Sequence, residues 1–172
     1  MPNGTLEDIR NLGIFNLPID EDLLLKAVIS AQNRGYIRTN FKRIVVSAPL
    51  GTTTTQIITP PEGRVLKYIA TDRIYTDIHD KDLKVSLTID GVHTVYNQVP
   101  LTRDISVDSI YFPYVQNEIK HTIINNGAYT AEFTEDAELL SIDKSFFDQV
   151  LNPLFTGQFD AIRDFANKVG GL

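Results

Sequence analysis

The segment Leu83-Lys84-Val85-Ser86-Leu87-Thr88-Ile89-Asp90-Gly91 decides the fold class, because it joins a strand pattern to a hairpin turn. Its leucine, valine and isoleucine residues alternate with polar residues, as in a strand that buries one face. Asp90-Gly91 then supplies the two residues that a tight hairpin turn prefers. The run from Val92 to Tyr96 returns as the second strand. This stretch predicts an antiparallel hairpin.

Comparable strand patterns continue on both sides of the hairpin. They cover residues 37–46, 52–58, 65–69, 105–112, 119–124, 128–133 and 139–142, with a second hairpin turn at 125–127. We expect roughly eight to ten short strands separated by turn signals, with no helical pattern between them. That organisation is typical of an all-β antiparallel sandwich of the jelly-roll type, and it disfavours a parallel α/β fold.

Helical patterns occur at the two ends of the chain. Asp20 stands as an N-cap before apolar residues that recur at helical spacing, and Gly35 follows as a stop. Asp143 can cap a second helix, which Asn152-Pro153 interrupts before another amphipathic stripe. We therefore expect an N-terminal helical arm over 1–35, a β-sandwich over 36–142, and a C-terminal helical segment over 143–172. The last segment packs on the body or on a neighbour.

The composition limits the partners. The 172 residues carry a formal net charge of -6, so we expect no nucleic-acid partner, because the chain would repel phosphates. There is no cysteine, which excludes disulfides and thiolate metal sites. The first residues lack the features of a signal peptide, so synthesis in the cytoplasm is expected. The apolar runs are too short to predict a membrane span.

Few side chains suggest chemistry. Asp72, Asp77, Asp80 and Asp82 are candidate calcium ligands, but their spacing does not match an EF-hand, and local turns explain them better. A cupin-like metalloenzyme would need His79, His93 and His121 to converge. The acidic residues over 132–138 are interpreted as a hairpin edge. Motifs for a serine nucleophile, a phosphate loop or a zinc protease are absent. We predict no catalytic residue, no metal, no cofactor and no enzyme activity.

Two groups of apolar residues suggest binding surfaces. Around Pro113, the aromatic residues Tyr111, Phe112 and Tyr114 could line a glycan site, although consecutive aromatics more often divide between the core and an interface. The helical ends carry more apolar surface than a small sandwich needs, and it must be buried somewhere. The candidate subunit-interface residues are Leu23, Leu24, Val28, Phe155, Phe159, Ile162 and Val169.

The stretch from Ile57 to Ile69, with Pro60-Pro61-Glu62-Gly63 as its turn, resembles phage virion proteins built on a jelly roll, as does the strand and turn at 83–91. The whole layout is similar to the small single-jelly-roll capsid proteins of tailless, membrane-containing icosahedral phages. This resemblance implies a shell-building subunit that self-associates or pairs with a second, larger capsid protein, in a particle with an internal membrane. It implies no catalytic residue.

Three functions follow, in this order. The first is a virion structural protein, made in the host cytoplasm, which serves as a capsid or capsid-accessory subunit and forms homo-oligomers. The second is a glycan- or receptor-binding module such as a phage spike or accessory head, and the third is a cupin-like metalloenzyme. The same fold serves all three, so the surface chemistry must decide among them.

Overall fold

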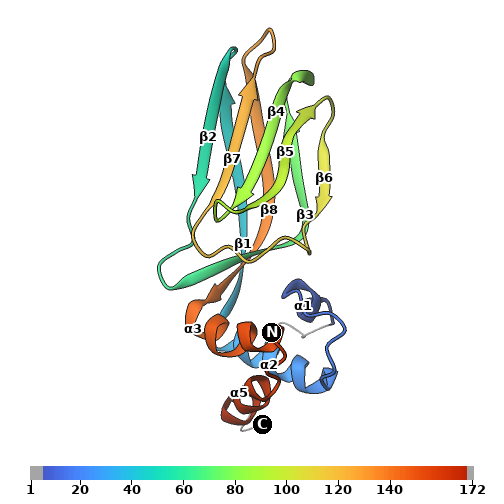
Figure 1. The fold of residues 1–172 in the computed structure, drawn as a ribbon, viewed down its shortest axis with the longest axis vertical. Helices are drawn as coiled ribbons and strands as arrows, with labels where there is room; N and C mark the ends of the chain where they lie inside the picture. The colour runs from blue at the N-terminus through green and yellow to red at the C-terminus, as the bar shows by residue number, and fades with distance from the viewer. Residues whose placement is uncertain (1–5, 170–172) are drawn as a thin grey trace.

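The computed structural model describes residues 6–169, and the strands in that part form two four-stranded antiparallel sheets (Figure 1). The strands are β1 (Ile37–Ala48), β2 (Thr52–Ile58), β3 (Arg64–Thr76), β4 (Asp80–Ile89), β5 (His93–Leu101), β6 (Ile105–Asp108), β7 (Ile119–Asn125) and β8 (Ala131–Asp143). Sheet A has the order β1-β8-β3-β6, and sheet B has the order β2-β7-β4-β5. The pairs β1–β8, β2–β7, β3–β6 and β4–β5 are those of one long hairpin rolled into two layers. This is the jelly-roll arrangement, so the predicted fold class is confirmed.

The helices from both ends of the chain lie together at one end of the sandwich (Figure 1). They are α1 (Leu6–Asn11), α2 (Glu21–Asn33), α3 (Lys144–Phe146), the π-helical turn η1 (Phe147–Leu151), α4 (Asn152–Phe155) and α5 (Asp160–Val169). The predicted caps are confirmed: the Asp20 carboxylate accepts the N–H of Asp22 at 2.9 Å, and Asp143 accepts that of Phe146 at 3.1 Å. Gly35 follows α2 with φ of 73°, as its role as a stop requires.

Two apolar cores share the strands of sheet A. The first core lies between the sheets and includes Leu66 and Leu139. The second lies between sheet A and the helices, and it includes the adjacent residues Val65 and Leu140. Successive residues of a strand point to opposite faces, so β3 and β8 are buried on both faces at this end. At this end of the sandwich, the helices therefore form a third layer over the outer face of sheet A.

Three predicted element boundaries are corrected. The strand expected over 105–112 ends at Asp108, because its carboxylate accepts the N–H of Ile110 in a local turn. The two strands expected over 128–133 and 139–142 are one strand, β8, so the acidic residues between them do not form a hairpin edge. Pro153 does not interrupt the C-terminal helix, because it occupies the first turn of α4 after the π-helical turn, where a missing N–H is tolerated.

The predicted turn at Asp90-Gly91 joins β4 to β5, and both residues have positive φ, 54° and 69°. The Asp90 carboxylate also accepts the backbone N–H groups of Gln116, Asn117 and Glu118 at 3.0, 2.7 and 3.0 Å. A single side chain therefore connects the hairpin to the segment that leads into β7.

Asp90→Ala is expected to lower the free energy of unfolding by about 1–3 kcal/mol, because three N–H groups lose their acceptor and alanine disfavours positive φ. Urea unfolding measures the change. Asp90→Asn is the matched control: it tolerates positive φ and keeps one acceptor oxygen, so its loss should be smaller. Equal stability of the alanine variant and the wild type would contradict this role.

Candidate functional site

Most of the interface candidates at the helical end pack against other residues of the same chain. Leu24, Val28 and Ile162 are buried in the second core, which corrects their assignment to a subunit interface, because they have no surface left for a neighbour. Leu23 and Phe159 are half-buried against the same core, and Phe155 is 37% exposed. The side chain of Val169 lies outside the described residues.

The four candidate metal ligands do not form one site. Asp72 points into the core between the sheets, away from the other three, which lie near the surface. The Asp77 carboxylate accepts the N–H of Glu132 at 2.6 Å, and the Asp80 carboxylate accepts the N–H of Asp82 at 2.9 Å. The Asp80 contact is a local turn of the kind expected, whereas the Asp77 contact reaches the start of β8. Within residues 6–169, no three His, Asp or Glu side chains are grouped closely enough to hold a metal ion.

The histidines of the cupin-like hypothesis also do not converge. His79 and His93 are exposed, and His79 Nε2 lies 2.8 Å from Asp104 Oδ1. His121, in contrast, is fully buried between the sheets. A metal site made from all three is therefore not present in this fold.

His121 belongs to a buried polar cluster that connects the two sheets. Its Nε2, on β7 of sheet B, lies 2.7 Å from Oε2 of Glu135, on β8 of sheet A. The Tyr96 hydroxyl, on β5 of sheet B, donates to Asp72 on β3 of sheet A. The Tyr68 hydroxyl donates to Oε1 of Glu135 at 3.3 Å. We call these five side chains the inter-sheet cluster, because two of its contacts pass from one sheet to the other.

Burial controls the protonation of this cluster. It raises the pKa of Asp72 to about 8, with the charge of Glu135 adding to the effect and the hydrogen bond from Tyr96 opposing it. Burial, followed by the nearby carboxylates, also raises the pKa of Tyr68 and Tyr96. Asp72 therefore carries a proton at pH 7, and both hydroxyls remain neutral hydrogen-bond donors.

A bulge in β3 places Asp72 in the cluster. Ile69 pairs with Glu138 and Arg73 pairs with Asp136, so the three residues 70–72 stand opposite a single residue of β8. Ala70 adopts φ of 58° in this bulge. The backbone N–H and side-chain hydroxyl of Ser109 both donate to the Ala70 carbonyl oxygen, each at 3.0 Å, and hold the bulge in place.

The sequence interpretation missed the inter-sheet cluster, although a signal was present. Glu135 stands between Phe133 and Ala137 at a spacing of two, on the apolar face of its strand. His121 stands in the same way between Ile119 and Ile123. Strand parity alone would have placed both side chains in the core, but it does not show that they meet.

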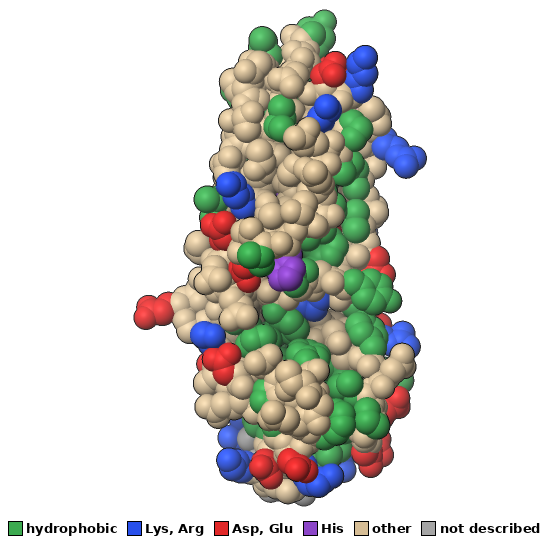
Figure 2. Space-filling model, in the orientation of Figure 1, with side chains coloured by type: hydrophobic (Ala, Val, Ile, Leu, Met, Phe, Trp, Pro, Cys, Tyr) green, Lys and Arg blue, Asp and Glu red, His purple; other side chains and the backbone are tan. Residues whose placement is uncertain are grey.

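A groove of about 310 Å³ lies where the sandwich meets the helices, and Phe15, Tyr111, Phe112, Tyr114 and Phe155 line much of it. Tyr111 is 78% exposed, and its ring centroid lies 5.7 Å from that of Phe15. Phe112 is buried in the first core, so these aromatics divide between the core and the exposed surface. Figure 2 shows a band of hydrophobic side chains that runs along one side of the sandwich and over the helical end.

The buried side chain of Lys67 holds one wall of this groove. Its Nζ donates to the carbonyl oxygens of Ile110, at 2.7 Å, and Phe112. It also lies 5.7 Å from the ring centroid of Tyr114, in a cation–π contact. Burial lowers the pKa of Lys67 to about 8. The lysine therefore fastens the 110–114 segment to β3 from within the protein.

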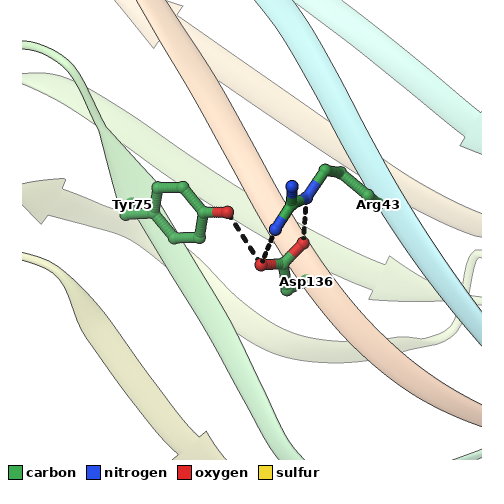
Figure 3. A network of polar contacts seen from close by, with 3 residues as sticks. All are labelled: Arg43, Tyr75 and Asp136. Carbon is green, nitrogen blue, oxygen red and sulfur yellow. Dashed lines mark hydrogen bonds and ion pairs between the residues drawn. The ribbon is translucent and has the colours of Figure 1, made fainter.

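The outer face of edge strand β1 carries a second apolar surface. Phe41 and Val45 are 57% and 54% exposed, and Arg43 lies between them on the same face. The Arg43 guanidinium donates two hydrogen bonds to Asp136, at 2.7 and 2.8 Å, and the Tyr75 hydroxyl donates a third at 2.7 Å (Figure 3). The hydrogen bond from Arg43, supported by that from Tyr75, lowers the pKa of Asp136 to about 2. The cation between the two apolar residues is thus neutralised within the chain.

Comparisons with known proteins show no family. No protein-family model and no curated protein sequence matches the chain. Among solved structures, it is similar to a family two carbohydrate esterase from Cellvibrio japonicus, with 12% identity over 61% of this chain and 34% of that chain and a TM-score of 0.28. The chain thus spans about a third of the esterase chain. It is also similar to an antigen and type I fimbria protein from Burkholderia pseudomallei, with 9% identity over 61% of this chain and 97% of that chain and a TM-score of 0.21. Neither likeness is close enough to carry a functional assignment.

No described helix combines the length and apolar character that a bilayer span requires.

Proposed function

We propose that the protein is a virion structural protein, a capsid or capsid-accessory subunit that builds a shell by associating with copies of itself. The exposed Phe41 and Val45 on β1 carry this proposal. Long edge strands in monomeric proteins are usually shortened, covered or kept polar, because they offer a template for another chain. Here the edge strand has 12 residues and exposes two large apolar side chains on its outer face.

The charge on this face favours a second copy of the chain as the partner. The ion pair between Arg43 and Asp136 lies within the subunit, so a neighbour need not supply a counter-charge. Apolar side chains around a self-neutralised ion pair suit contact between identical surfaces, because the same patch on both subunits then meets without unpaired charge across a two-fold axis. The jelly roll is also the fold of many viral capsid domains. In this role the protein is not an enzyme, it resides in the virion, and a larger capsid protein is a further partner.

Self-association tests the proposal. Sedimentation and light scattering over a wide range of concentrations should show wild-type dimers or larger assemblies. The double variant Phe41→Ser/Val45→Ser should weaken association by about tenfold or more, because it removes two apolar contacts. Ile57→Ser, on the edge strand of sheet B, is the matched control and should associate as the wild type does. A wild type that stays monomeric at every concentration would overturn the proposal, and electron microscopy of the assembled fractions shows whether they form closed shells.

The aromatic groove supports one alternative, a glycan- or receptor-binding module. The exposed ring of Tyr111 beside Phe15 is the kind of platform on which a sugar face packs. Glycan-array binding that Tyr111→Ala abolishes, together with a monomeric wild type, would favour this alternative over shell building.

A further inference from the structure

The inter-sheet cluster contains two buried carboxyl groups on neighbouring strands. Ile74 of β3 pairs with Glu135 of β8, and Asp72 lies two residues before Ile74 on the same face. The two carboxyl groups are therefore diagonal neighbours on the inner face of sheet A. Oδ1 of Asp72 receives no hydrogen bond from the described residues. His121 Nε2 lies 2.7 Å from Oε2 of Glu135, but this contact does not have the geometry of a hydrogen bond.

We propose that Asp72 and Glu135 hold one proton between them, and that this proton limits the negative charge buried between the two sheets, so that the sandwich loosens as the pH rises from acid to mildly alkaline. This inference goes beyond the proposed shell-building function and does not depend on it.

The charges of the inter-sheet cluster support a proton shared by the two carboxyl groups. With the shared proton, the two neighbouring carboxyl groups carry a single negative charge beside the buried His121 ring. Without it, they carry two negative charges in a core that excludes water, and the excess buried charge is costly. The groups facing them are the Tyr68 hydroxyl from β3 and the Tyr96 hydroxyl from β5. Among residues 6–169 the other buried charged side chain is Lys67, on the opposite face of sheet A.

The direction of the pH effect follows from Asp72. Burial and the charge of Glu135 raise its pKa from 3.8 to about 8, so the folded protein binds this proton more tightly than the unfolded chain. Stability therefore falls as the pH rises between these two values, and the contribution of Asp72 levels off above about pH 8. One proton of difference multiplies the unfolding equilibrium constant by up to about tenfold per pH unit.

Urea unfolding of the full chain between pH 5 and 8, at concentrations where it is monomeric, tests the proposal. The unfolding equilibrium constant of the wild type should rise by up to about tenfold per pH unit, and Asp72→Asn should remove that rise. Asp136→Asn is the matched control. Asp136 is on the same strand as Glu135, but its pKa of about 2 lies outside the range, so the rise should remain. A rise of equal size in the wild type and in Asp72→Asn would overturn the proposal.

Infrared spectroscopy supplies a second measurement that does not require Asp72→Asn to fold. The folded wild type at pH 7 should show the carbonyl stretch of one protonated carboxyl group, and this band should disappear near pH 9. The Asp136→Asn variant should keep the band. Its absence from the folded wild type at pH 7 would show that the two carboxyl groups do not share a proton.

Discussion

Replacing His121 with leucine is expected to lower the free energy of unfolding by about 3–5 kcal/mol at pH 7. His121 Nε2 lies 2.7 Å from Oε2 of the Glu135 carboxylate, and both side chains are fully buried. Removing one partner leaves a charge in a core that offers no water to solvate it, which costs far more than the pair itself contributes. Urea or thermal unfolding followed by circular dichroism measures the loss.

A double variant separates the buried charge from lost packing. In His121→Leu/Glu135→Gln the carboxylate is neutral, and the amide oxygen still accepts from the Tyr68 hydroxyl. Most of the stability lost by His121→Leu should therefore return. His93→Leu, at an exposed position on β5, serves as the control and should change stability by less than about 0.5 kcal/mol. If the double variant were as unstable as His121→Leu, the loss would come from packing.

Phe146→Ala is expected to lower the free energy of unfolding by about 3–5 kcal/mol. Phe146 is buried in the second core, where its ring stacks on Tyr36 at 5.7 Å between centroids and contacts Phe165 at 4.9 Å. Truncation would open a cavity between Tyr36, just before β1, and the helices α3 and α5. Because these contacts are within one chain, the loss should be the same at two protein concentrations about a hundredfold apart.

The concentration dependence distinguishes a packed helical layer from an exchanged arm. If the helices docked on a neighbouring subunit, the stability lost by Phe146→Ala would vary with protein concentration. Phe155→Ala is the matched control on the same helical segment. Its side chain is 37% exposed, so a loss smaller than that of Phe146→Ala is expected at every concentration.

Because the helices pack on their own subunit, the surface expected to contact another copy of the chain is no longer at the helical end. The apolar stripes of the terminal segments suggested arms that bind neighbours, but Leu24, Val28 and Ile162 complete the chain's own second core. Among the large apolar side chains that remain exposed, Phe41 and Val45 lie on the outer face of β1, and Tyr111 lies at the rim of the aromatic groove. Contact with another copy of the chain is therefore better sought at β1 than at the helices.

Local signals in the sequence were sufficient wherever a few neighbouring residues determine the structure. Asp90-Gly91 specifies its turn because glycine and aspartate tolerate positive φ, and Asp20 and Asp143 specify helix starts because their carboxylates reach the next free N–H groups. The alternation over 83–89 specified a strand with one buried face. Together these signals predicted the all-β sandwich and the helices at the two ends of the chain.

Contacts between distant residues could not be read in the same way. The sequence determined that Glu135 and His121 lie on apolar strand faces, but only the packing of the sheet that contains β8 on the sheet that contains β7 brings them within 2.7 Å. Strand periodicity also shows which face is apolar without showing what covers it, so the terminal helices could belong to this subunit or to a neighbour. The tertiary structure decided both points, because side chains far apart in the chain meet only after the sheets have packed.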